Sequence, residues 1–265
     1  RGLRIDDRVH AEKCLDRIGY YPLRAYWYPF REISTDQQES KRRDQFRAGA
    51  NFDDVLKFYL FDKSLRLTLN DALERIEIAV RAKLIETLGA IQPCSYRDPR
   101  TYTSSFTQGD EQQGPLLDPF IEGLDRSFDK SQEEFAKHFR HKYDMPPPVW
   151  IAAGTWDWGN LSERNRDAIC KAVDSRLSRK SLASWMKALN EVRNACAHHS
   201  RLWNKALINS PRLNPGEISE FNYLANARGK VADECRTRLY GALMVKCILM
   251  RALYPKTLWP QRLGQ

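Results

Sequence analysis

Apolar residues recur at helical spacing over much of the chain. The longest regular run covers residues 65–88, where leucine, isoleucine, valine and alanine return every three or four positions until Gly89, a residue suited to ending a helix. A shorter run begins after Asn51, whose side chain can cap a helix with Asp53 and Asp54 in its first turn. The same periodicity predicts further helices over residues 9–18, 116–143, 162–173, 181–204 and 231–253.

The segments between these runs lack a sustained period. Residues 33–47 are polar and charge-rich and favour a loop with a partial helix, and residues 90–115 have the Pro, Gly, Ser, Thr and Gln content of a long surface loop. Residues 204–229 are also rich in turn formers. Because neither useful strand alternation nor an internal repeat is present, we expect an all-α fold: a helical bundle with additional helices and long loops, formed as one domain over residues 1–265.

The stretch 185–204 has two chemically different faces when it is drawn as a helix. Four polar residues fall within about 140° of one another on an ideal helix: Arg193, Asn194, His198 and Arg201. The opposite, apolar face contains Trp185, Ala188, Leu189, Val192, Cys196, His199 and Trp203. We therefore expect a helix with one buried face and one basic face that carries an imidazole.

Charge and composition narrow the choice of partners. The chain has 43 Lys and Arg against 34 Asp and Glu, a net charge of +9, so its surface should attract polyanions. That charge favours RNA or DNA over an anionic membrane. The sequence has neither a signal-peptide pattern nor an apolar run long enough to cross a membrane, so we expect a soluble, cytoplasmic protein. Its six cysteines form no C-x-x-C pair and should be free thiols.

Arg193 and His198 fit metal-independent RNA cleavage. Such cleavage needs a base for the ribose 2′-hydroxyl, an acid for the leaving oxygen, and positive charge beside the phosphate. Histidine can serve as acid or base near neutral pH, and arginine is a fixed bidentate clamp. Asn194 would orient the site or contact the substrate. Since one histidine cannot easily be acid and base together, two copies of the chain should meet across a two-fold axis as a homodimer.

Other chemistries fit less well, and we expect neither a metal nor a cofactor. Cys196, His198 and His199 are close in sequence, but a helix points Cys196 away from His198 and no fourth ligand lies nearby. Phosphate-binding, dinucleotide-binding and zinc-protease motifs are absent.

Further candidates for RNA contact lie along the chain. Arg201 and Asn204 follow the central motif, and Arg66 and Arg81 are weaker candidates on the predicted helices. Glu77 and Arg81 are also spaced as an i,i+4 ion pair. Residues 19–31 alternate aromatics with arginines, including Arg24 and Tyr26, a pattern that suits base stacking and phosphate binding. The same pattern equally fits a turn at the edge of the core with arginines reaching to solvent.

Five segments resemble the Abi-like proteins of bacterial abortive infection, members of the wider HEPN group of RNases. They span most of the chain in the family's order: GYYPLRAYWYPF (19–30), FYLFDKSLR (58–66), ERIEIAVRA (74–82), PPVW (147–150) and RNACAHHSRLWN (193–204). The last resembles the HEPN Arg-x4-His signature. The resemblance implies an HEPN-like bundle, a dimeric composite active site, and metal-independent endoribonuclease activity used as a defence toxin. It also implies a small structured RNA as a candidate inhibitor.

Two alternatives remain open at this stage. A non-catalytic RNA-binding or toxin-neutralising module would keep the basic face without turnover, whereas a purely structural interaction protein leaves the paired Arg193 and His198 unexplained. The two adjacent histidines should also differ. Helix geometry places His198 on the polar face and His199 beside Val192 on the apolar face, so His198 should be catalytic and His199 structural.

Overall fold

The computed structural model of the protein describes residues 1–33, 42–109, 114–143, 145–159, 170, 176–224, 229–259 and 261. Helices dominate it, and its strands, within this described part, form one two-stranded sheet. The all-α prediction is confirmed. The chain divides into two compact units, one formed by Arg1–Asn70 with Asn194–Lys205 and the other by Asp71–Arg193 with Ala206–Gln265.

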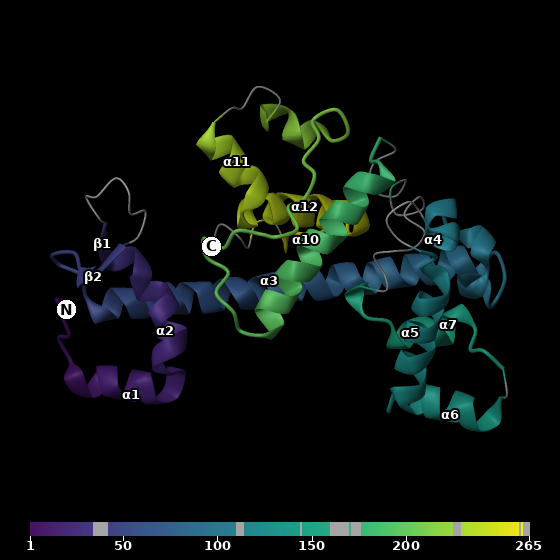
Figure 1. The fold of residues 1–265 in the computed structure, drawn as a ribbon, viewed down its shortest axis with the longest axis horizontal. Helices are drawn as coiled ribbons and strands as arrows, with labels where there is room; N and C mark the ends of the chain where they lie inside the picture. Colours follow the sequence, from purple (N-terminus) through teal and green to yellow (C-terminus); the bar gives the residue numbers. More distant parts are fainter. Residues whose placement is uncertain are drawn as a thin grey trace. The chain divides into compact units, whose positions relative to one another are not determined.

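The first unit contains the N-terminal elements and the start of a long helix (Figure 1). Its elements are α1 (Arg8–Ile18), α2 (Tyr20–Trp27), η1 (Tyr28–Phe30), β1 (Arg31–Ile33), β2 (Arg42–Phe46) and the part of α3 (Phe52–Gly89) up to Asn70. Where a loop with a partial helix was expected, β1 and β2 pair as antiparallel strands, with Arg31 opposite Phe46 and Ile33 opposite Arg42.

Local signals in the sequence explain where these helices begin and end. The side chain of Asp7 accepts a hydrogen bond from the amide of His10 at the start of α1. Gly19 lies between α1 and α2 and has a φ of 89°. Glycine adopts this positive φ at little cost in free energy because it has no Cβ atom. At the start of α3, the amide of Asp53 donates to the side chain of Asn51 over 2.9 Å, so the predicted cap is confirmed.

The core of the first unit is aromatic where α2 meets α3. Leu23, Tyr26 and Phe30 are buried there. The ring of Tyr26 meets that of Tyr59 edge to face at 5.5 Å, and the ring of Phe30 meets that of Phe58 in the same way at 5.6 Å. These contacts fix α2 against the first turns of α3.

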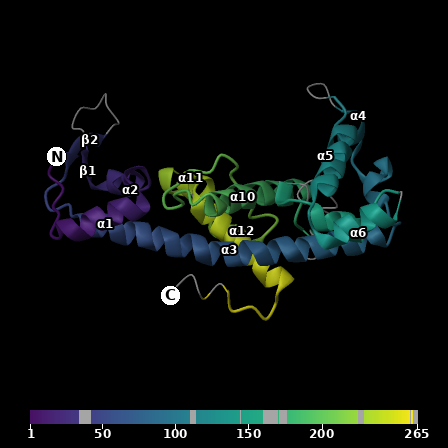
Figure 2. The ribbon, with the colours of Figure 1, turned by 90° about the horizontal axis from the view of Figure 1, so that it is seen from below.

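The second unit contains the remainder of α3 and all later elements except the end of α10. These are η2 (Ser95–Arg97), η3 (Pro99–Thr101), α4 (Ser104–Gln108), α5 (Leu117–Lys130), α6 (Glu134–Lys142), α7 (Val149–Ala152), η4 (Ala153–Thr155), α10 (Arg179–Ala197) up to Arg193, η5 (Ser219–Leu224), α11 (Lys230–Thr237) and α12 (Leu239–Leu253). Figure 2 shows α5 and α6 next to each other, as in Figure 1.

Several predicted helix boundaries differ from the structure. The two runs before Gly89 form one continuous helix of 38 residues, α3. The predicted helix 116–143 is divided at Ser131, and 231–253 is divided at Arg238, whose extended backbone forms a bridge with Ala206. The predicted helix 162–173 lies almost wholly outside the described residues.

Residues 90–115, expected to be a surface loop, contribute to the core of the second unit. They contain η2, η3 and α4, and the side chain of Tyr96 is only 1% exposed. Its hydroxyl donates a hydrogen bond to the carbonyl of Pro147 over 2.9 Å, and the Ser95 hydroxyl donates to the carbonyl of Leu88 over 2.7 Å. The segment is thus tied both to α3 and to the PPVW motif.

None of the helices in the described part of the chain combines the length and the apolar character that crossing a membrane requires.

Candidate functional site at the end of helix α10

Helix α10 ends at Ala197, seven residues before the predicted end of the helix at Asn204. The amide of His199 donates to the carbonyl of Cys196 over 3.1 Å, and the amide of Ser200 donates to the carbonyl of Ala195 over 2.9 Å. These two bonds and the left-handed φ of 55° at His199 define a Schellman turn. Such a turn usually contains glycine at the left-handed position, and because histidine stands there instead, this helix end carries no stop signal in the sequence.

This turn changes the expected roles of the two adjacent histidines. His198 and His199 are both exposed, and the chain is no longer helical where they lie. The prediction that His199 lies on the apolar face is therefore wrong, because that face ends with the helix. Val192 and Cys196 are buried as expected. His198 remains the exposed imidazole directly after the helix, but exposure alone no longer separates it from its neighbour.

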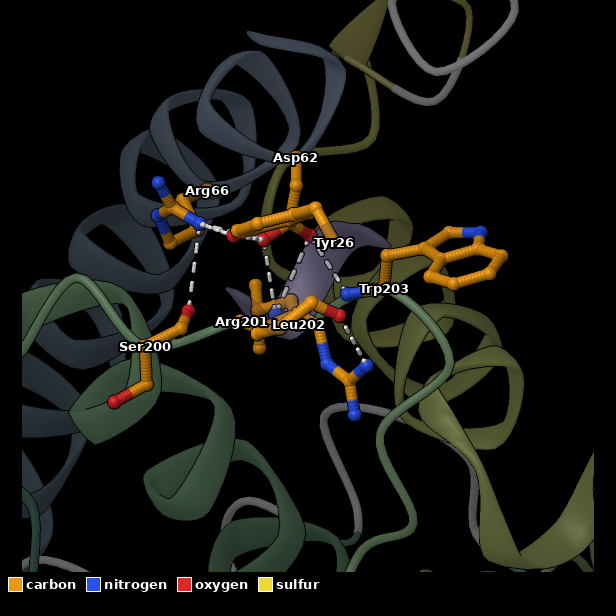
Figure 3. Close-up of polar contacts among 8 residues, drawn as sticks. Tyr26, Asp62, Arg66, Ser200, Arg201, Leu202 and Trp203 are labelled. Atoms are coloured by element: carbon orange, nitrogen blue, oxygen red, sulfur yellow. Dashed lines mark hydrogen bonds and ion pairs between the residues drawn. The ribbon is translucent and has the colours of Figure 1, made fainter. Parts of the chain in front are cut away.

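The chain after the turn is held by Asp62, a fully buried residue of α3 (Figure 3). One carboxylate oxygen, Oδ1, accepts a 2.6 Å hydrogen bond from the amide of Trp203, and Oδ2 accepts one of 3.1 Å from the amide of Leu202. Oδ2 also accepts from the Tyr26 hydroxyl over 2.6 Å and from Nη1 of Arg66 over 2.5 Å. Four donors thus satisfy a carboxylate that would be costly to bury alone.

Two arginine side chains also fix this segment. Nη1 of Arg66 lies 3.4 Å from the carbonyl oxygen of Ser200, and Nη1 of Arg201 donates to the carbonyl of Ala25 over 3.0 Å (Figure 3). The Trp203 ring meets Phe58 edge to face at 5.0 Å. Residues 200–203 are therefore each held by a polar contact, and the backbone that follows His198 has little freedom to move.

Burial and the neighbouring carboxylate keep Tyr26 protonated. Burial of the phenol, followed by its hydrogen bond to Asp62, raises the pKa of Tyr26 to about 12. The hydroxyl thus remains a donor to Asp62 at neutral pH.

Tyr26 and Arg66 were candidates for RNA contact, but in the structure both contact the buried carboxylate of Asp62. Tyr26 is only 3% exposed, so its ring offers no face to a base, and the edge-of-core alternative fits this residue. The Arg66 side chain is 7% exposed and is paired with Asp62. Both residues support the segment after His198 and do not face solvent. Arg24, on α2, is exposed.

The other candidate residues lie as follows. Arg193 is half-buried and Asn194 exposed within α10, and Asn204 is exposed with a left-handed φ of 53°. The boundary between the two compact units falls between Arg193 and Asn194. In the second unit, Nη2 of Arg81 pairs with Glu77 over 2.7 Å and donates to the carbonyl of Trp156 over 3.0 Å. The predicted Glu77–Arg81 pair is confirmed, and Arg81 has a structural partner.

Sequence reasoning missed Asp62, the residue with the most contacts at this site. One signal was present, since Asp62 directly follows the apolar stretch FYLF and precedes Arg66 by one helical turn. A carboxylate on an apolar helix face needs a buried partner, and that requirement could have been inferred. Its bonds to residues 202 and 203 could not, because 140 residues separate Asp62 from Leu202.

Fold and site together define an all-α protein in which an exposed histidine precedes a backbone segment fixed by a buried carboxylate. The sequence matches the model of the Abi-like protein family over residues 13–204, more than half of the chain, and the chain belongs to that family. Membership suggests a function of the abortive-infection type. The match ends at Asn204, the last residue of the central motif. Searches of curated proteins and of solved structures each gave no match.

Proposed function

We propose that this Abi-like protein is a metal-independent endoribonuclease of a bacterial abortive-infection or toxin–antitoxin system, and that it uses an HEPN-type Arg193-x4-His198 site. The observation that carries the proposal is the placement of His198. Its imidazole is exposed, while residues 200–203, which follow it, are fixed by the buried carboxylate of Asp62. An exposed imidazole on a constrained backbone suits a general acid or base.

The reaction needs one bond to form and one to break. A histidine accepts the proton of the ribose 2′-hydroxyl, and the 2′-oxygen then attacks the adjacent phosphorus. The bond from phosphorus to the 5′-oxygen breaks, and a second histidine donates a proton to the departing oxygen. The products are a 2′,3′-cyclic phosphate and a 5′-hydroxyl. Arg193 would balance the charge that develops on the phosphate oxygens, and Asn194 would orient the substrate.

The two proton-transfer roles suggest that two copies of the chain contribute to one site. Each chain has one His198, and a single imidazole cannot readily take and give protons on opposite sides of the phosphorus at once. A homodimer in which the two Arg193 and His198 faces meet would supply both groups. The net charge of +9 supports an RNA substrate and a structured RNA inhibitor as partners.

The runner-up is a non-catalytic RNA-binding or toxin-neutralising module. The basic charge of the chain supports binding as well as it supports cleavage. The two functions differ in turnover: only the enzyme shortens RNA when RNA is in large excess over protein.

The experiment is incubation of the full chain with excess total cellular RNA in the presence of EDTA, followed by analysis of the new RNA ends. We expect multiple turnovers and ends that carry 2′,3′-cyclic phosphate or its 3′-phosphate hydrolysis product. Binding without turnover would favour the runner-up. Activity lost in EDTA and restored by Mg²⁺ would contradict the proposed mechanism.

A further inference from the structure

A groove between α6 and α7 in the second unit has no part in the proposed cleavage. It has a volume of about 630 Å³ and includes Trp150, the last residue of the PPVW motif. Four of its eight lining residues are Phe, Tyr or Trp, namely Phe135, Phe139, Tyr143 and Trp150, and the others are Glu134, His138, Pro148 and Ile151. Figure 1 shows the two helices that form it at the same end of this unit.

Three of the aromatic side chains in the groove are unusually exposed. Phe135 is 38% exposed, Tyr143 44% and Trp150 50%. Below them, Phe139 is buried and packs on Phe128 edge to face at 6.0 Å. The groove therefore has a packed apolar floor and aromatic walls that are exposed to solvent. This arrangement is more typical of a binding surface than of a protein core.

Close packing beneath the walls fixes the rings in place. A Cβ atom added at Gly154 would lie 2.7 Å from Cζ of Phe135, so only glycine permits this approach. A Cβ at Gly89 would lie 3.7 Å from the Trp150 ring, which places that indole directly over the end of α3. The Tyr143 ring is tilted 36° on Phe139 with their centroids 4.9 Å apart. Rings held in this way lose little entropy when a flat ligand stacks on them.

Positive charge lies along the same helix. Helix α6 ends in Arg140, His141 and Lys142, and Lys137 is exposed one turn earlier. Arg140 donates hydrogen bonds to the carbonyls of Phe128 and Ser131. The Lys142 ammonium, in contrast, lies 5.3 Å from the Tyr143 ring centroid, at the edge of the groove. Glu134 lies at the other end and pairs with Lys137 over 3.6 Å. The charge on α6 is thus mainly positive next to exposed rings.

We propose that this groove binds unpaired nucleotides of a single-stranded nucleic acid. Bases would stack on Trp150 and Tyr143, and a phosphate would lie beside Lys142. Aromatic platforms beside lysines are the usual means of holding single strands, because every base has a flat face and every linkage a charge. The inference goes beyond the proposed cleavage, since α6 and α7 contribute no residue to that chemistry. It adds a second surface for RNA on the same chain.

The test is fluorescence anisotropy of the full chain with a fluorescein-labelled oligodeoxythymidylate of about ten nucleotides, a length within the usual span of a single-strand site. A DNA strand lacks the 2′-hydroxyl and cannot be cleaved by the proposed reaction, so binding is measured whether or not the protein is an RNase. We expect Trp150→Ala to raise Kd about tenfold and Trp150→Phe, which keeps a stacking face, to stay near wild type.

A charge-reversal variant tests the proposed contact between lysine and phosphate. Lys142→Glu should weaken binding and lower the slope of log Kd against log salt by about one or more. Lys13→Glu, the same change at an exposed position of α1, should alter that slope less. If Trp150→Ala binds the strand as tightly as wild type, the proposal is wrong. The same holds if a strand carrying 4-thiothymidine cross-links only outside residues 134–155.

Discussion

Oδ1 of Asp62 accepts a 2.6 Å hydrogen bond from the backbone amide of Trp203, a residue 141 positions later in the chain. The carboxylate is fully buried, and Tyr26, Arg66 and Leu202 donate to it as well. This contact connects the first half of α3 to the segment that follows His198. Because this contact fixes the backbone after His198, we expect the position of His198 to be constrained.

Asp62→Ala should destabilise the protein strongly. The change leaves Arg66 buried without its ion-pair partner and two backbone amides without an acceptor, so we expect a loss of about 3–5 kcal/mol in unfolding free energy. Amide hydrogen exchange at Leu202 and Trp203 should become much faster. Asp54→Ala is a matched control on the same helix, since Asp54 pairs with Lys57 near solvent, and it should cost no more than about 1 kcal/mol. Equal losses for the two variants, or unchanged exchange at Trp203, would disprove the role given to Asp62.

Tyr26 predicts a particular response to alkaline pH. Its pKa is about 12 in the folded protein against 10.0 for a free phenol. Between these two pH values the folded state keeps a proton that the unfolded state loses. The contribution of Tyr26 to the free energy of unfolding is therefore complete below pH 10 and disappears as the pH rises towards 12. Tyr26→Phe should lose about 1 kcal/mol at pH 8 and show a shallower decline of stability between pH 10 and 12. Denaturant unfolding across that range measures both, and parallel curves for the two proteins would count against the assignment.

The left-handed backbone at His199 predicts that glycine is better tolerated there than in the helix before it. His199→Gly removes the clash between Cβ and the backbone at φ 55°, so unfolding free energy should rise by up to about 1 kcal/mol. Ala197→Gly, at the last helical residue, should instead lower it by about 0.5 kcal/mol. Thermal or denaturant unfolding measures whether each substitution raises or lowers the free energy of unfolding. A loss on His199→Gly larger than that on Ala197→Gly would mean that the imidazole itself makes a stabilising contact.

Subunit mixing can test the composite site. We expect an equal mixture of wild type and His198→Ala, after exchange of subunits, to have about a quarter of the activity of wild type at the same total concentration, because only dimers with two histidines would act. Independent sites would give about half. A protein that remains monomeric by mass measurement while cleaving RNA would rule out the composite site altogether.

Much of the helical architecture follows from the sequence, because helix formation depends on local periodicity and caps. The cap at Asn51 and the buried positions of α3 before Gly89 are found this way. The breaks at Ser131 and Arg238 are not, since neither residue is a strong helix breaker. Arg238 becomes extended by pairing with Ala206, and such a distant partner leaves no periodic signal.

The position of the candidate site in the chain could be predicted from the sequence, but the contacts that hold its residues in place could not. The motif drew attention to His198, and the structure leaves this residue exposed. The end of α10 was misplaced because His199 adopts a conformation that glycine or asparagine usually marks. Tyr26 was a candidate for RNA contact because an aromatic between arginines fits a base-stacking surface and a core edge equally well. Its burial and its bond to Asp62 distinguish the two.

The most direct measurement compares RNA cleavage in EDTA by wild type, His198→Ala and a control, His10→Ala, which removes another exposed histidine. We predict that His198→Ala reduces the cleavage rate by a factor of about 10² or more while melting temperature and RNA binding stay near wild type. His10→Ala should cleave normally. A folded His198→Ala protein that still produces cyclic-phosphate ends at the wild-type rate would contradict the account.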